Sequence, residues 1–204
     1  PTKDKEGYLR ALGQYADLMT VNMYGRQNYT EINRVIEAMY KYTGLPFIVT
    51  EFGVRAKESV DMNGHTLGNY TDTACWLVQT QQQRANSYES YVLNLLESNN
   101  CVGWILYRFR DNDQSIYADG EGNQYLLSSS PKATELMYTN IQTGEVVSGS
   151  QVAMTKIYFG ETDSSNLSHN KGIYDNHMEP YTEMMTSMKR ISDNLLDLIR
   201  FFGE

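Results

Sequence analysis

Several residue types are scarce in this sequence, and each scarcity excludes a class of protein. The 204 residues include two cysteines, Cys75 and Cys101, which are too few for a disulfide framework. Only 17 lysines and arginines stand against 25 aspartates and glutamates, so the chain lacks the basic surface that nucleic acids require. No apolar run approaches the ~20 residues that cross a bilayer. We therefore expect no nucleic-acid or membrane partner and two buried free thiols.

The three histidines show no metal-binding spacing, so we expect neither a metal nor a cofactor. The sequence begins at Pro1 and carries no visible signal peptide, so we expect a longer parent protein whose location cannot be read directly. Tyrosine is the abundant aromatic, with 16 copies against 2 tryptophans and 6 phenylalanines. A tyrosine side chain combines a stacking face with a hydroxyl, which suits polar-ring ligands. The alternative is that these tyrosines are half-buried under loops.

Hydrophobic periodicity predicts alternating strands and helices. Apolar runs without alternation predict strands that are buried on both faces, whereas apolar residues at helical spacing predict helices between them. The expected strands are 16–24, 46–53 and 101–109, and the expected helices are 30–42, 72–97 and 179–202. This order requires parallel strands with right-handed crossovers. Three such units do not close a barrel, so a small open α/β sheet is the structural alternative.

The stretch 110–170 differs from the rest because it is polar, rich in glycine and serine, and without a helical period. Within it, 132–149 predicts one or two β-hairpins with Thr143-Gly144 at a turn. We interpret the stretch as an insertion that follows the last strand of the α/β region.

The three expected strands change abruptly from apolar to polar at their carboxyl ends, which read VNMYGR, VTEFGVR and LYRFRDND. Active sites of parallel α/β folds form at that edge. Glu51 closes an apolar strand and is followed by Phe52 and Gly53, so its carboxylate is a candidate catalytic group. The alternative is a strand-end glutamate paired with Arg26, Arg55 or Arg108.

Together these motifs resemble retaining glycoside hydrolases of the large (β/α)8-barrel clan that includes β-galactosidases, endo-glucanases and β-agarases, and among them most the agarase- and porphyranase-like members. In that family, P-x-[IV]-[IVT]-[TS]-E-[FY]-G marks the seventh strand, and 46–53 match it throughout. The sixth strand often ends in a tyrosine, matched by Tyr24, and the eighth often carries Gly-Trp and then Asp-Asn-Asp, matched by Gly103-Trp104 and 111–113. Two later family segments are matched by 170–174 and 179–181.

The resemblance implies an α/β fold of the TIM (β/α)8-barrel type, with residues 1–204 forming the C-terminal part of its catalytic domain. It implies that Glu51 is the nucleophile of a retaining glycosidase acting on a poly- or oligosaccharide. It also implies that the Tyr24 hydroxyl lies about 2.5–3.0 Å from the Glu51 carboxylate, ordinary hydrogen-bonding distance. An extracellular or periplasmic location follows only from that substrate class.

Further candidates for substrate binding are Asn22, Arg26, Trp104 and Asp111. Trp104 would support a sugar ring, and a core tryptophan is its alternative. Arg26, like Arg55, would bind sugar hydroxyls or anionic groups, and salt bridging is its alternative. Asp111, like Asp113, would hydrogen-bond sugar, and a solvated loop is its alternative.

The sequence also departs from the family pattern. The family's general acid is a glutamate after an asparagine on the fourth strand, and this chain contains no Asn-Glu pair. We therefore expect the acid and the N-terminal half of the barrel to lie upstream of Pro1 or on a second chain, and this chain alone to be inactive. Leu106 stands where agarase-like members have a second tryptophan, which puts the same substrate in doubt. The competing function is a non-catalytic carbohydrate-binding half-barrel that needs a second chain.

Overall fold

The computed structural model describes residues 3–24, 29–59, 76–111, 115–128, 136–158, 171–175 and 177–203. Its centre is a parallel sheet in the order β1-β2-β5. The strands are β1 (Met19–Asn22), β2 (Phe47–Phe52) and β5 (Cys101–Leu106). The partial α/β architecture predicted from the apolar runs is therefore present, with each strand a few residues shorter than predicted.

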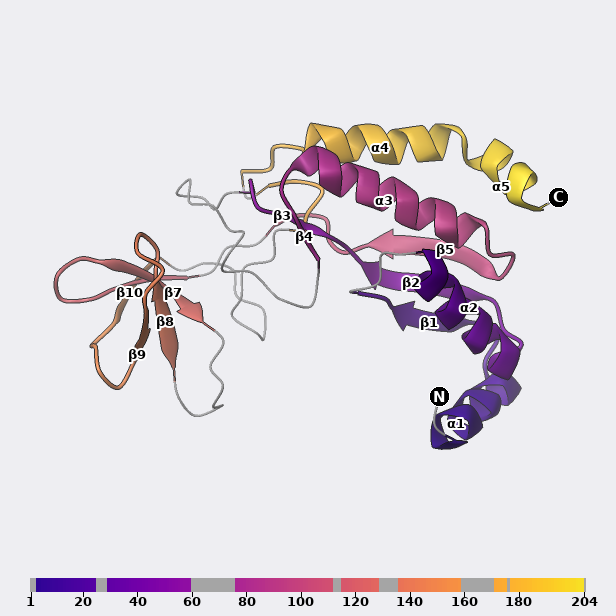
Figure 1. Cartoon of the computed structure of the whole chain (residues 1–204), viewed down its shortest axis with the longest axis horizontal. Helices are drawn as coiled ribbons and strands as arrows, with labels where there is room; N and C mark the ends of the chain where they lie inside the picture. The colour runs from indigo at the N-terminus through magenta and orange to yellow at the C-terminus, as the bar shows by residue number, and fades with distance from the viewer. Residues whose placement is uncertain are drawn as a thin grey trace.

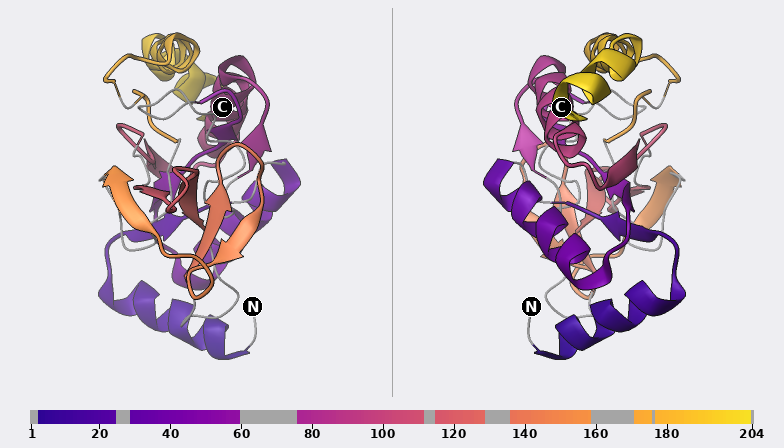
Figure 2. Two further views of the ribbon diagram at one scale, coloured as in Figure 1. Left: turned by 90° about the vertical axis from the view of Figure 1, so that its left-hand side faces the viewer. Right: turned by 90° about the vertical axis from the view of Figure 1, so that its right-hand side faces the viewer.

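Helices cover one face of this sheet, as Figures 1 and 2 show. They are α1 (Lys3–Tyr15), α2 (Tyr29–Thr43), α3 (Gln81–Leu96), α4 (Thr182–Asp193) and α5 (Leu195–Gly203). The core lies between α2, α3 and the sheet, and α4 packs against α3 and adds Met184 and Ile191 to the same core. Ile32, Val49 and Leu95 are each fully buried there. Ile105 lies between the core residues Trp104 and Leu106 of β5, so it points to the opposite face, where it is 57% exposed. Val102 is 61% exposed and lines a pocket together with Trp104 and with Leu195 of α5.

A second, antiparallel sheet lies within the predicted insertion, in the order β10-β6-β7-β8-β9. Its strands are β6 (Ile116–Ala118), β7 (Gln124–Ser128), β8 (Met137–Asn140), β9 (Val146–Ser148) and β10 (Thr155–Tyr158). The predicted hairpin is β8–β9, and Gly144 in its turn has φ +74°, the left-handed region that favours glycine. This sheet lies beyond the carboxyl ends of the parallel strands (Figure 1).

Two expectations about helices were wrong, and one helix was not expected. The helix predicted over 72–97 begins at Gln81, where Thr80 Oγ1 accepts a hydrogen bond from the backbone N–H of Gln83 at 3.1 Å. Just before it, β4 (Leu77–Val78) pairs with β3 (Arg55–Ala56). The predicted final helix is divided at Asn194 into α4 and α5, and α1 was not predicted.

The only described cysteine, Cys101, is a free and half-buried thiol whose pKa is raised by that burial. Cys75 lies outside the described residues. Of the helices that the structure describes, none combines the length and the apolar character needed to cross a membrane.

Candidate active site

Glu51 and Tyr24 meet at the carboxyl ends of two neighbouring parallel strands. Glu51 is opposite Asn22 in the β1–β2 register, and the Met23 N–H donates to the Glu51 carbonyl at 2.7 Å. This pairing brings Tyr24 beside the half-buried Glu51 side chain. The Tyr24 hydroxyl donates to Glu51 Oε2 at 2.9 Å, so the predicted hydrogen bond is confirmed.

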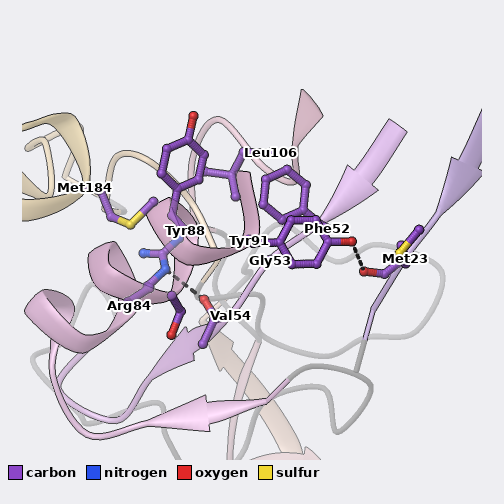
Figure 3. A pocket seen from close by; sticks show the side chains of 10 residues that line it. Met23, Phe52, Gly53, Val54, Arg84, Tyr88, Tyr91, Leu106 and Met184 are labelled. Atoms are coloured by element: carbon purple, nitrogen blue, oxygen red, sulfur yellow. Dashed lines mark hydrogen bonds between the residues drawn. The ribbon is translucent and has the colours of Figure 1, made fainter. Parts of the chain in front are cut away.

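Helix α3 supports this pair from behind the sheet. Phe52, the residue after Glu51, stacks on the ring of Tyr91 with centroids 4.3 Å apart. The Tyr91 hydroxyl donates to the carbonyl of Met23 at 3.2 Å, as Figure 3 shows. The backbone before Tyr24 and the backbone after Glu51 are therefore fixed by one aromatic side chain of α3.

Two residues to which the sequence reasoning gave no role, Tyr107 and Lys171, complete the cluster. Tyr107 directly follows β5, and its ring is 6.4 Å from that of Tyr24 in an edge-to-face arrangement. Lys171 is 2% exposed, and its Nζ lies 4.9 Å from the Tyr24 ring centroid and 5.1 Å from that of Tyr107. These are cation–π distances. The site therefore joins one carboxylate, two tyrosines and one buried ammonium.

Gly53 allows this close arrangement because it has no side chain. A Cβ built on Gly53 would lie 2.7 Å from the carbonyl oxygen of Tyr107 and 3.7 Å from Cδ of Lys171. Any larger residue would push the end of β5 away from Glu51. The glycine after the predicted nucleophile therefore has a packing reason in this chain.

The other predicted site residues lie in different surroundings, and one of them is not described by the structure. Asn22 is exposed at the end of β1, and its Oδ1 accepts a hydrogen bond from Thr50 Oγ1 at 2.9 Å, close to Glu51 in register. Trp104 points into the layer between the sheet and the helices, where its Nε1 donates to the Tyr88 hydroxyl at 3.3 Å. The indole of Trp104 is half-buried beside α3, and its role as a sugar platform stays a prediction. Arg26 lies outside the described residues.

Asp111 does not lie in a solvated loop, so that alternative was wrong, whereas its contact with substrate stays a prediction. Asp111 is 0% exposed. Its carboxylate accepts hydrogen bonds from the Gly172 N–H at 2.5 Å and from the Tyr181 hydroxyl at 2.6 Å. Burial raises the pKa of Asp111 to about 6, against the lowering effects of nearby Arg84 and of these two donors. Asp113 lies outside the described residues.

This raised pKa predicts a pH-dependent difference in stability between the wild type and Asp111→Asn. Because the folded protein holds the Asp111 proton more tightly than the unfolded chain, the stabilisation by that proton is complete below pH ~4 and lost as pH rises through about 6. The difference corresponds to ~3 kcal/mol. Urea unfolding of both proteins between pH 4 and pH 7 should show that the free energy of unfolding of the wild type falls by ~3 kcal/mol relative to that of Asp111→Asn. A pH-independent difference would contradict it.

Arg84 and Tyr181 were missed as partners of Asp111. Arg84 lies among glutamines at the start of α3, which suggests a solvated cation. The available signal was its spacing, because Arg84, Tyr88, Tyr91 and Leu95 follow one helical face and all are buried. Arg55, a further candidate cation, is 6% exposed on β3 rather than open to ligand.

The sequence matches no protein-family model and no curated protein. Solved structures do resemble the fold. The protein BpGH50 aligns with 98% of this chain and 30% of its own at a TM-score of 0.58 and 21% identity. An exo-β-agarase aligns with 94% of this chain and 18% of its own (TM-score 0.56, 16% identity), and the agarase AgWH50C with 94% and 21% (0.55, 15%). The chain thus spans less than a third of these proteins and shares the fold of that part of them.

Proposed function

We propose that this chain forms part of a retaining glycoside hydrolase in which Glu51 is the nucleophile. The observation that carries the proposal is the hydrogen bond from Tyr24 to Glu51 at the carboxyl ends of adjacent parallel strands. That edge is where parallel α/β folds build active sites. The likeness of the fold to parts of agarases supports the same substrate class.

In the proposed reaction, Glu51 attacks the anomeric carbon of a poly- or oligosaccharide while an acid protonates the leaving oxygen. The covalent glycosyl-enzyme is then hydrolysed by water, which the same acid, now a base, activates. Retention requires the second carboxyl group to lie roughly 5–5.5 Å from Glu51. Asp111 does not supply it, because its carboxylate is buried against Gly172 and Tyr181. We assign the acid to a part of the protein outside this chain.

The uncovered face of the parallel sheet supports the same division of the site. Among the described residues, the sheet ends at β1 on one side and β5 on the other, and Ile105 is exposed on the face away from the helices. Unpaired strand edges and exposed apolar side chains are unfavourable unless other elements cover them. The proposed occupant is the N-terminal half of a (β/α)8 barrel, from the same protein or a second chain. Residues 1–204 then form its C-terminal part, with 110–170 inserted.

Tyr24 would hold the Glu51 carboxylate in position for attack. A hydrogen bond to a charged group contributes ~1.5–3 kcal/mol, so in the full-length protein Tyr24→Phe should lower kcat about 10- to 100-fold. The variant keeps the ring that contacts Tyr107 and Lys171. Tyr8→Phe on α1, which is 66% exposed, is the matched control and should leave kcat unchanged. Full activity in Tyr24→Phe would remove Tyr24 from the mechanism.

A non-catalytic carbohydrate-binding half-barrel is the second candidate function. It is favoured by the burial of Asp111, which leaves the half-buried Glu51 as the strand-end carboxylate that the described residues supply. A panel of glycans and aryl glycosides, tested on the full-length protein, separates the two functions. Turnover with retained anomeric configuration supports the enzyme. Binding of a glycan without turnover supports the carbohydrate-binding protein. We expect the enzyme, with an extracellular or periplasmic location suited to polysaccharides.

A further inference from the structure

Arg84 is a buried cation that the proposed reaction does not use. It is 1% exposed and lies in the first turns of α3. A buried charge is costly unless its donors are satisfied. Arg84 Nε donates to the carbonyl of Val54 at 2.8 Å, Nη2 to the carbonyl of Gly172 at 2.7 Å, and Nη1 to Gln81 Oε1 at 3.1 Å. Figure 3 shows the guanidinium turned towards the carbonyl of Val54.

The two carbonyls belong to segments that carry site residues. Val54 is the third residue after Glu51, and Gly172 directly follows Lys171. One planar guanidinium therefore links the chain leaving the predicted nucleophile to the chain that carries the buried ammonium. The Nε and Nη2 donors to these carbonyls are fixed in one rigid plane, a geometry that a lysine ammonium on a flexible stem does not reproduce.

Gly172 also contacts the chain that follows β5. Its N–H donates to Asp111, and a Cβ built on Gly172 would lie 2.2 Å from the Asp111 nitrogen and 2.5 Å from the Tyr174 oxygen. The segment 171–175 thus lies tightly against the chain after β5, where the Arg108 N–H donates to the Lys171 carbonyl at 3.1 Å. The backbone on which Lys171 stands has little freedom while Arg84 is bonded.

We propose that Arg84 is a positioning residue of the candidate active site, which holds Lys171 against the rings of Tyr24 and Tyr107 and thereby fixes the hydroxyl that donates to Glu51. The functional part of this inference rests on the proposed role of Glu51. The physical part, the hold on the Lys171 segment, does not. A purely structural Arg84 would stabilise the fold without any coupling to Lys171.

Hydrogen exchange of the full-length protein tests the physical part without any activity. Arg84→Lys should raise the exchange rates of amides in 171–175 about 10-fold or more, the effect of one lost hydrogen bond to a charged group. Exchange in the antiparallel sheet should stay unchanged. The control is Arg190→Lys on α4, whose exposed guanidinium pairs with Glu89. Unchanged exchange in 171–175 in Arg84→Lys would overturn the proposed hold.

A double-mutant cycle on kcat tests the functional part. Arg84→Lys alone should lower kcat about 10-fold with KM changed less than about threefold. In the Lys171→Met background, the same substitution should have little further effect, because both changes interrupt one linkage. Independent, multiplicative losses would overturn the positioning role even if the exchange result held. Wild-type activity that survives Glu51→Gln would reject the proposed function and leave the exchange result to stand by itself.

Discussion

Glu51→Gln in the full-length protein should lower kcat by roughly 10⁴- to 10⁶-fold, the range seen when a covalent enzyme loses its nucleophile. The amide has nearly the same shape as the carboxylate, and its oxygen can still accept the hydrogen bond that Tyr24 donates at 2.9 Å. The fold should therefore persist while the ability to form a glycosyl ester is lost. Steady-state kinetics and an unfolding curve of the same sample separate the two effects.

The nucleophile assignment also predicts chemical rescue. In Glu51→Ala, external azide should enter the vacated space and restore turnover, with a glycosyl azide of inverted configuration as the product. Glu121→Gln, in an exposed turn of the antiparallel sheet, is the control and should behave as wild type. Near-normal activity of Glu51→Gln would end the assignment.

The second large effect concerns the 204-residue chain by itself, which should hydrolyse neither aryl nor natural glycosides. Cleavage with retention needs a proton donor as well as a nucleophile. Among described strand ends, Glu51 is the carboxylate open to a ligand, because Asp111 is buried and hydrogen-bonded to its own chain. The purified chain should therefore show no glycosidase activity at concentrations at which the full-length protein is active.

The same chain should also need a covering surface to stay in solution. Leu196 and Phe201 of α5 are 69% and 74% exposed, in addition to Val102 and Ile105 of β5. Glycosidase activity of the isolated chain that disappears in Glu51→Gln would contradict the prediction. It would mean that Asp113 or a second copy of the chain brings another carboxylate to Glu51.

The parts of the fold that the sequence predicts are those set by local pattern. Unbroken apolar runs such as 46–53 indicate strands buried on both faces, and β2 lies there. The Tyr24–Glu51 contact was expected from the family resemblance, and it fits parallel strands that bring their carboxyl ends to one edge. The hairpin around Gly144 depends on turn residues that need no distant partner.

The errors arise where distant segments decide the outcome. Leu77 and Val78 fit a helical period, yet they form β4 because β3 pairs with them from twenty residues or more away in the chain. Asp111 follows a strand in a polar run, yet Gly172 and Tyr181, 61 and 70 residues later, bury it. The choice between a sugar platform and a core residue for Trp104 could likewise not be made from the sequence, because irregular pairing between β2 and β5 decides which face of β5 the indole occupies. No local pattern encodes these contacts.

Trapping the covalent intermediate tests the central claim most directly. The active full-length protein would be incubated with an activated 2-deoxy-2-fluoro derivative of its substrate sugar, quenched in acid, digested and analysed by mass spectrometry. The account predicts that the peptide containing Glu51 gains the mass of one fluoroglycosyl group, and that fragmentation places the group on Glu51. A label on another carboxylate would contradict it.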